Sequence, residues 1–324
     1  SNSLIFECRH SLELELKMNT TTKTYSLSLL VAMVCSLGCQ RGLPENAGSN
    51  SEGNVSQVAS NFEMQSVAGS GSSEQLPDPT GFGNITGTIK INGKIDTTKF
   101  VAYAVNKDAN VCSAEPNQRV QVNGTGLQWG LLYYDGPFEQ GNEAWDHPDY
   151  AAQATAVLDG DLAFDQKACI FLSRIKAMRT GQTLKILNSD SVGHNAKLDG
   201  LTSANLQIGA GASVDYKPGF QESKPFGVSC SAHPWMGSYV IVRDNSLYAV
   251  SGEDGGFEIE NVPSGVALPF KFWHEVIPSG SMDITINGET TKISRGGFEL
   301  PPLEAGQDLT LDIVIDAKAF NDAL

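Results

Sequence analysis

The segment Cys230-Ser-Ala-His-Pro-Trp-Met236 places three metal-binding side chains within a few residues of one another. A thiolate, an imidazole and a thioether together suit copper that alternates between Cu(I) and Cu(II). In such sites two histidines and one cysteine form a plane, and a weakly bound methionine lies on its axis. The segment supplies Cys230, His233 and Met236, so a second histidine must come from elsewhere. Beyond the amino-terminal export segment, the remaining candidates are His147, His194 and His274.

A short ligand loop also has a mechanical purpose. Electron transfer is fast when a site changes little between oxidation states, and ligands on a rigid loop between packed strands resist rearrangement. Pro234 stiffens the turn directly after one ligand. We expect His233 and Trp235 to lie near the surface, where an electron would have a short exit.

The elements around this loop read as strands. Alternating apolar residues occur at 85–95 around the Asn92-Gly93 turn, at 162–171, at 184–187 and at 239–242, and no stretch keeps a helical period. Many short strands with turn signals between them predict an all-β protein with a Greek-key sandwich over residues 81–244. The aromatic and acidic residues 124–156 are expected to form a long inserted loop.

A second unit is predicted over residues 245–320. The stretch 248–260 reads as strand, glycine-rich turn and strand, 268–275 as a further strand, 284–293 as a hairpin across Asn287-Gly288, and 309–315 as a closing strand. Such a length suffices for a small seven-stranded β-sandwich.

Residues 181–242 resemble the cupredoxin family of small blue-copper electron carriers. The spacing from Cys230 to Met236 is similar to that of the amicyanins, where a proline also follows the histidine. The strand 181–190, followed by His194-Asn195, resembles the family segment that carries the first ligand. The resemblance implies one type 1 copper with His194, Cys230 and His233 as equatorial ligands and Met236 as the axial ligand. It also implies that Asn195 ties the two ligand loops together.

The unit at 245–320 resembles the carboxypeptidase-regulatory-like, transthyretin-like sandwich. The resemblance rests on the stretches 248–251, 254–265 and Trp273-His-Glu275. It implies a structural or adhesive module, sometimes of a carbohydrate-binding kind, and no catalysis. His274 is expected to be a packed residue rather than a metal ligand, and His147 a loop residue.

Three of the six cysteines, Cys112, Cys169 and Cys230, lie beyond the export segment. An odd number favours one disulfide and one functional thiol in an oxidising compartment. We expect Cys112 and Cys169 to pair, fastening the start of the first domain to a central strand.

The amino-terminal residues predict export. Met18 is a candidate start, and the apolar run 27–37 has the length of a signal-peptide core and is too short to span a bilayer. It ends at Ser36-Leu37-Gly38-Cys39, which resembles a bacterial lipobox and makes Cys39 a candidate for lipidation. Residues 40–80 are rich in Ser, Gly, Asn and Gln and are expected to form a disordered linker. These features predict a periplasmic or envelope protein, lipid-anchored to the membrane.

The formal net charge of −15 disfavours nucleic acid as a partner. We expect an electron carrier with a redox partner protein, since multicopper catalysis needs a second histidine cluster that the few histidines cannot supply. A single-copper enzyme is one alternative. The other is a structural, ligand-binding or carbohydrate-binding envelope lipoprotein whose copper site is secondary or a store.

Overall fold

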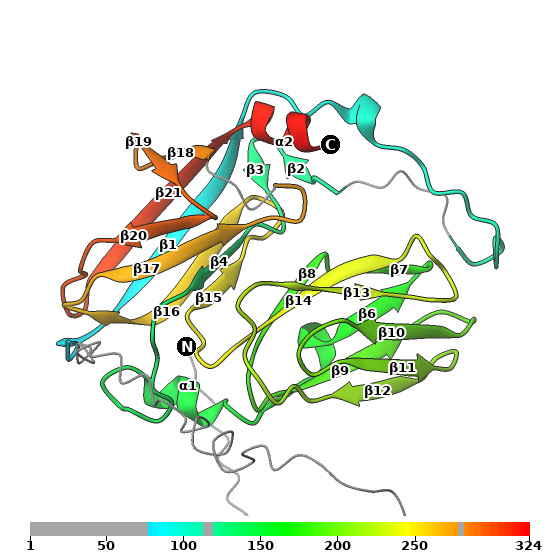
Figure 1. The fold of residues 1–324 in the computed structure, drawn as a ribbon, viewed down its shortest axis with the longest axis horizontal. Coiled ribbons are helices and arrows are strands. Elements are labelled where there is room, and N and C mark those ends of the chain that lie inside the picture. Colours follow the sequence, from blue (N-terminus) through cyan, green and yellow to red (C-terminus); the bar gives the residue numbers. More distant parts are fainter. Residues whose placement is uncertain (1–76, 113–118, 278–281) are drawn as a thin grey trace, which may run out of the picture. The chain divides into compact units, whose positions relative to one another are not determined.

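The computed structural model describes residues 77–112, 119–277 and 282–324 (Figure 1). Strands far outweigh helices in the described chain, which confirms the all-β class expected from the sequence. The predicted export segment 1–39 with Cys39 and nearly all of the predicted linker 40–80 lie outside these ranges. Within them, no helix is both long enough and apolar enough to cross a membrane.

Residues 157–243 form one sandwich, which we call the site sandwich. One of its sheets has the strand order β11-β10-β13-β14-β8 and the other β12-β9-β6-β7, with β5 beside β9. Side chains of both sheets form one buried core, and in β9 every second residue is buried, as a half-covered strand requires. Its strands are β5 (Val157–Leu158), β6 (Phe164–Lys167), β7 (Ile170–Phe171), β8 (Ile175–Arg179), β9 (Thr183–Asn188), β10 (His194–Leu198), β11 (Ala204–Ile208), β12 (Ser213–Tyr216), β13 (Phe226–Ser229) and β14 (Gly237–Arg243).

The remaining strands form a second sandwich, which we call the flanking sandwich. Its larger sheet has the order β19-β18-β21-β1-β3-β2, with β16 also paired to β1, and its smaller sheet has the order β15-β4-β17-β20. Both contribute to a separate apolar core. Its strands are β1 (Gly81–Asn92), β2 (Val122–Asn123), β3 (Gly126–Leu127), β4 (Leu131–Tyr134), β15 (Tyr248–Val250), β16 (Gly256–Ser264), β17 (Leu268–Trp273), β18 (Met282–Ile286), β19 (Glu289–Ile293), β20 (Gly297–Leu300) and β21 (Asp308–Asp316).

The expected boundary between the two units, at residues 244 and 245, does not match this strand pairing. β1 was assigned to the copper domain, but it runs parallel to β21 from Asn84–Asp308 to Asn92–Asp316 and antiparallel to β16. The flanking sandwich is therefore built from both ends of the described chain and has more strands than the seven expected. The physical reason is that an alternating pattern fixes which face of a strand is buried, but not which strand lies beside it.

The stretch 124–156 is not simply an inserted loop. It contains β3 and β4, and all four residues of β4 are buried. Leu132 and Tyr134 point into the flanking core, whereas Leu131 and Tyr133 pack in a further apolar cluster with residues of β8 and β14. Because both faces of β4 are covered, its sequence lacks the alternation of apolar and polar residues that marks a half-exposed strand. The sequence pattern therefore did not reveal it as a strand.

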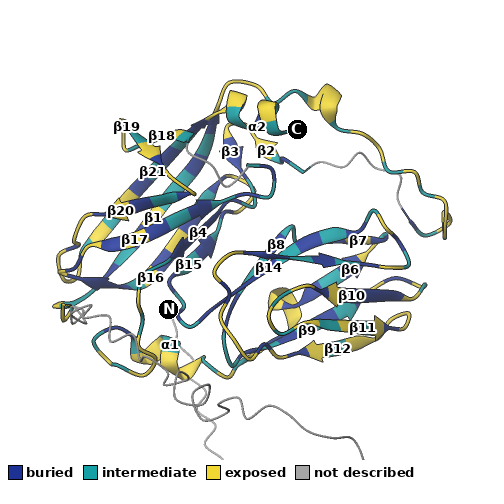
Figure 2. Ribbon diagram, viewed as in Figure 1, coloured by how far each residue is buried: buried dark blue, intermediate teal, exposed yellow. Residues whose placement is uncertain are grey.

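Short helices complete the fold: the 3₁₀ helices η2 (Thr97–Lys99) and η3 (Gly160–Leu162), α1 (Pro148–Ala152) and α2 (Ala317–Ala323). Figure 2 shows buried residues along the strands and exposed residues mainly in the turns and in α1. His147 is the N-cap of α1, the residue directly before its first turn, and its Nδ1 accepts a hydrogen bond from the Asp149 amide at 3.3 Å. It is therefore a capping residue in a loop, in line with the expectation.

Candidate metal centre

Two adjacent strands and one loop position the donor residues. His194 is the first residue of β10, and Cys230 directly follows β13. β10 pairs with β13, and β13 pairs with β14 up to Ser229–Gly237, so the segment 230–236 is the connection between two hydrogen-bonded strands. The sheet therefore brings His194 beside the loop although it precedes His233 by 39 positions in the sequence.

The ligand loop is closed by its own backbone. The Met236 amide donates to the His233 carbonyl at 2.9 Å, and the Cys230 amide donates to the Met236 carbonyl at 3.3 Å. Pro234, at the tip, is exposed and has no amide hydrogen to satisfy. The closed loop brings the Cys230 sulfur to 3.8 Å from the His233 Nδ1.

Three donor atoms converge inside the protein. The Nδ1 atoms of His194 and His233 lie 3.0 Å apart, and the Cys230 sulfur lies 3.8 Å from the His233 Nδ1. One ligand atom from each of the three residues lies within 4.8 Å of the others. Their side chains are almost completely buried, with His233 at 0 % exposure. The structure thus brings together the cysteine and the two histidines selected from the sequence.

Each imidazole is held from behind by a carboxylate. His194 Nε2 lies 2.8 Å from Asp190, and His233 Nε2 lies 2.9 Å from Asp108. A carboxylate accepts a hydrogen bond, so each Nε2–H points to its carboxylate and each Nδ1 faces the centre, where it can bind a metal through its lone pair or, without a metal, hold a proton that is shared with its neighbours. Two facing lone pairs beside a sulfur need a cation or a shared proton between them. This donor set, of two imidazoles and one thiolate, fits copper.

The surroundings of Cys230 favour its thiolate. Burial opposes ionisation of the thiol, but hydrogen bonds from His194, the Asn195 backbone and His233 outweigh it and lower the Cys230 pKa to about 6. Burial likewise opposes the charged form of His194, yet its hydrogen bonds with Cys230 and Asp190 raise the His194 pKa. The site is therefore arranged for a deprotonated sulfur, the form that binds metals.

Asp190 is itself fixed by the backbone. Its carboxylate accepts hydrogen bonds from the amides of Ala168 and Cys169, at 2.7 Å and 2.8 Å, in addition to its contact with His194. Burial opposes its ionisation, but these three hydrogen bonds lower the Asp190 pKa overall. A fixed anion behind His194 keeps the ring in one orientation.

Asn195 joins the two parts of the site, as the resemblance implied. Its Oδ1 accepts a hydrogen bond from the Ser231 amide at 2.8 Å and lies 3.4 Å from the Cys230 sulfur. Its Nδ2 donates to Asn205 at 2.7 Å, which fixes the side chain from the other end. The side-chain amide of Asn195 therefore links β10 to the ligand loop.

The structure also places the other residues of the predicted site. Met236 is buried in the same core, and Trp235 is half-buried with its indole nitrogen donating to the Cys169 carbonyl at 3.1 Å. The expectation that His233 lies near the surface is wrong, because Asp108 and the ring of Trp235, 5.2 Å away, cover it.

Cys112 and Cys169 form a disulfide, the expected pairing. Cys169 lies in the turn between β6 and β7, however, and not in a central strand. The sulfur atoms of this disulfide approach His233, but bonded to each other they are not thiolate ligands. His274 is buried and its Nδ1 accepts a hydrogen bond from the Val276 amide, which agrees with a packing role.

Sequence reasoning missed Asp190 and Asp108. Asp190 precedes His194 by four positions, so proximity in the sequence was a usable signal. Asp108 precedes His233 by 125 positions, in a segment without any metal-binding pattern, and nothing in the sequence pointed to it.

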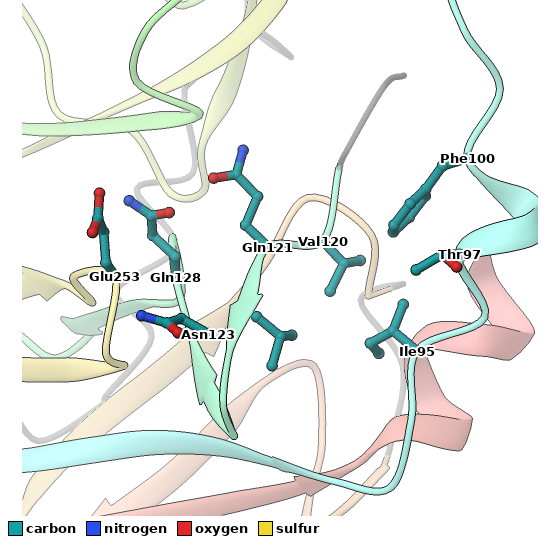
Figure 3. Close-up of a pocket in the computed structure, with 9 residues that line it drawn as sticks. Ile95, Thr97, Phe100, Val120, Gln121, Asn123, Gln128 and Glu253 are labelled. Carbon is teal, nitrogen blue, oxygen red and sulfur yellow. The ribbon is translucent and has the colours of Figure 1, made fainter. Parts of the chain in front are cut away.

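A cavity of about 520 Å³ lies elsewhere, on the flanking sandwich (Figure 3). Ile95, Phe100 and Val120 form an apolar side. Asn123, Gln128 and Glu253 add amide and carboxylate groups to the lining, as Figure 3 shows. These groups can contact an uncharged polar ligand, but none of the lining residues is a histidine or cysteine.

No family model matches the chain, and no curated protein matches it. Among solved structures it is similar to a copper-containing nitrite reductase from Thermus scotoductus SA-01, at 17% identity, over 25% of this chain and 21% of that chain, with a TM-score of 0.23. It is also similar to a Cu(I) form of an amicyanin variant, at 13% identity over 36% and 99% of the two chains, and to an oxidised amicyanin variant, at 14% over 35% and 98%, each with a TM-score of 0.23. Scores this low leave the functional argument to the geometry of the site.

Proposed function

We propose that this protein binds one copper ion in a type 1 site, with His194, Cys230 and His233 as equatorial ligands and Met236 as the axial ligand. The single observation that carries the proposal is the convergence of two imidazole Nδ1 atoms and one thiol sulfur within 4.8 Å in the protein interior. Copper supplies a one-electron couple, which this mixture of nitrogen and sulfur donors stabilises in both oxidation states.

We infer that the protein transfers single electrons and does not transfer its copper ion to another protein. The residues support this by holding the site still: Asp190 and Asp108 fix the rings, and Asn195 fixes the loop against β10. A buried, preorganised ligand set has little to rearrange when an electron arrives or leaves. A copper store or chaperone would instead need an accessible site.

The proposal includes a protein partner of opposite redox role and a location at the cell envelope, with a lipid anchor on Cys39. The export-like segment that ends at Cys39 supports the location. Labelling with a fatty-acid analogue tests the anchor, and a chain that takes no label at Cys39 would contradict it.

The optical spectrum of the copper-loaded full-length chain tests the site. We expect strong absorption in the orange-red from Cys230 thiolate-to-copper charge transfer, and its loss in Cys230→Ser. Met236→Leu should shift this absorption, whereas Met178→Leu, which changes a buried methionine of the same core, should not. Colourless copper-loaded protein, or colour that persists without Cys230, would refute the proposal.

The cavity of Figure 3 favours a second candidate function, the binding of a saccharide by the flanking sandwich. Amides both donate and accept hydrogen bonds, and an aromatic ring such as Phe100 offers an apolar face, which together suit a hydroxyl-rich ligand. A glycan array with the wild-type protein and Gln128→Ala tests it; equal signals for the two proteins would contradict it.

A further inference from the structure

Asp108 reaches the metal centre from a segment that belongs to neither sheet of the site sandwich. Its carboxylate lies 2.9 Å from His233 Nε2, and its side chain is 31% exposed while His233 is fully buried. Asp108 thus separates the imidazole edge from a solvent-facing hollow that Lys107, Asp108, His194 and Ala232 help to line.

The backbone around Asp108 is fixed. Its carbonyl accepts hydrogen bonds from the amides of Val111 and Cys112, both at 2.9 Å, and the residue adopts a φ of 51°, a left-handed conformation that aspartate tolerates better than most residues. The disulfide from Cys112 to Cys169 attaches this turn to the site sandwich. The carboxylate therefore sits on a short, tethered turn and not on a free loop.

A fixed acceptor at Nε2 has two consequences for His233. It keeps the proton on Nε2, so that Nδ1 stays free to bind a metal, and it fixes the plane of the ring. It also brings a negative charge to the far side of a ligand, which makes the imidazole more electron-donating and favours the more highly charged metal state.

We propose that Asp108 is a positioning residue for His233 and that its charge biases the bound copper towards Cu(II), lowering the reduction potential of the site. This inference rests on the proposed copper site. It adds a residue whose effect passes through a ligand, from a part of the chain outside the ligand strands.

Asp108→Asn isolates the charge, because asparagine keeps an oxygen that can accept the His233 hydrogen bond. We expect the ratio of Cu(II) to Cu(I) affinity to fall about tenfold, which corresponds to a rise in potential of about 59 mV for one electron. Asp108→Ala removes the acceptor as well, and we expect Cu(II) affinity to fall by about 10- to 100-fold. Asp161→Asn, a change at an exposed aspartate of the same sandwich, is the matched control and should leave both quantities unchanged.

The experiment uses the full-length copper-loaded chain. Its potential is measured by redox titration of the charge-transfer band, and Cu(II) affinity by competition with a chelator. Equal potentials for Asp108→Asn, Asp161→Asn and wild type would overturn this inference. The proposed copper site would still stand in that case, provided that the wild type shows the charge-transfer band. A wild type without the band would instead overturn the proposed function. Thermal unfolding of each copper-free variant shows whether it folds. If Asp108→Ala does not fold, the potential of Asp108→Asn alone tests the inference.

Discussion

The thiol of Cys230 should ionise far below the pH at which an ordinary cysteine does. The structure lowers its pKa from 9.0 to about 6, and three pKa units correspond to about 4 kcal/mol in favour of the thiolate. At pH 7 the copper-free site should hold about ten thiolates per thiol, whereas an ordinary cysteine of pKa 9.0 would hold about one thiolate per hundred thiols. Below pH 6 protons compete with copper for the sulfur as well as for His194, whose pKa is raised, so copper affinity should fall at least about tenfold for each further pH unit.

Among the groups that lower this pKa, the hydrogen bond from His194 contributes most. In His194→Gln the ionisation midpoint should therefore rise by about one unit or more. The corresponding change at a histidine outside the site, His147→Gln, should leave it in place.

Thiolate absorbance in the ultraviolet measures the midpoint in the copper-free chain. Cys8, Cys35 and Cys39 also absorb when ionised, so the signal of interest is the difference between each protein and the same protein carrying Cys230→Ser. A difference titration with its midpoint near pH 9, or one that does not move in His194→Gln, would refute the reasoning about the site.

Two further predictions concern stability. Asp146→Ala should reduce the free energy of unfolding by about 3–5 kcal/mol, because it leaves the guanidinium of Arg179 buried without its partner. Asp215→Ala breaks an exposed ion pair and should reduce the free energy of unfolding far less in the same denaturant titration. Equal effects of the two substitutions would contradict this prediction. Replacing both Cys112 and Cys169 by serine should cost about 4 kcal/mol, from the chain entropy of a loop with a sequence separation of 57; unfolding midpoints that are unchanged under non-reducing conditions would show that the crosslink does not constrain the unfolded chain.

The local part of the site could be predicted from the sequence. Cys230, His233 and Met236 lie within one turn between two strands, so the short chain between them limits how far apart they can be. His194 needed the resemblance, because composition alone left other histidines open. The structure brings it beside the loop through the pairing of β10 with β13.

The long-range part could not be predicted. The contact between Asp108 and His233 depends on a turn, a disulfide and a sheet that are far apart in the sequence. Likewise, β1 pairs with β21, and the whole site sandwich lies between these two strands in the sequence. A strand pattern that records only burial gives no information about either.

The burial of His233 also bears on how electrons would reach a copper ion bound at the proposed site. A partner cannot touch the imidazole edge directly while Asp108 covers it, so the more accessible neighbours of the loop gain importance. Pro234 is exposed, and Trp235 is half-buried with its ring 5.2 Å from that of His233. Both also line a hollow together with Arg174, whose guanidinium is held by Glu275. If electrons leave through this face, Trp235→Ala should slow electron exchange with a soluble partner more than it shifts the reduction potential, whereas Asp108→Asn should do the opposite.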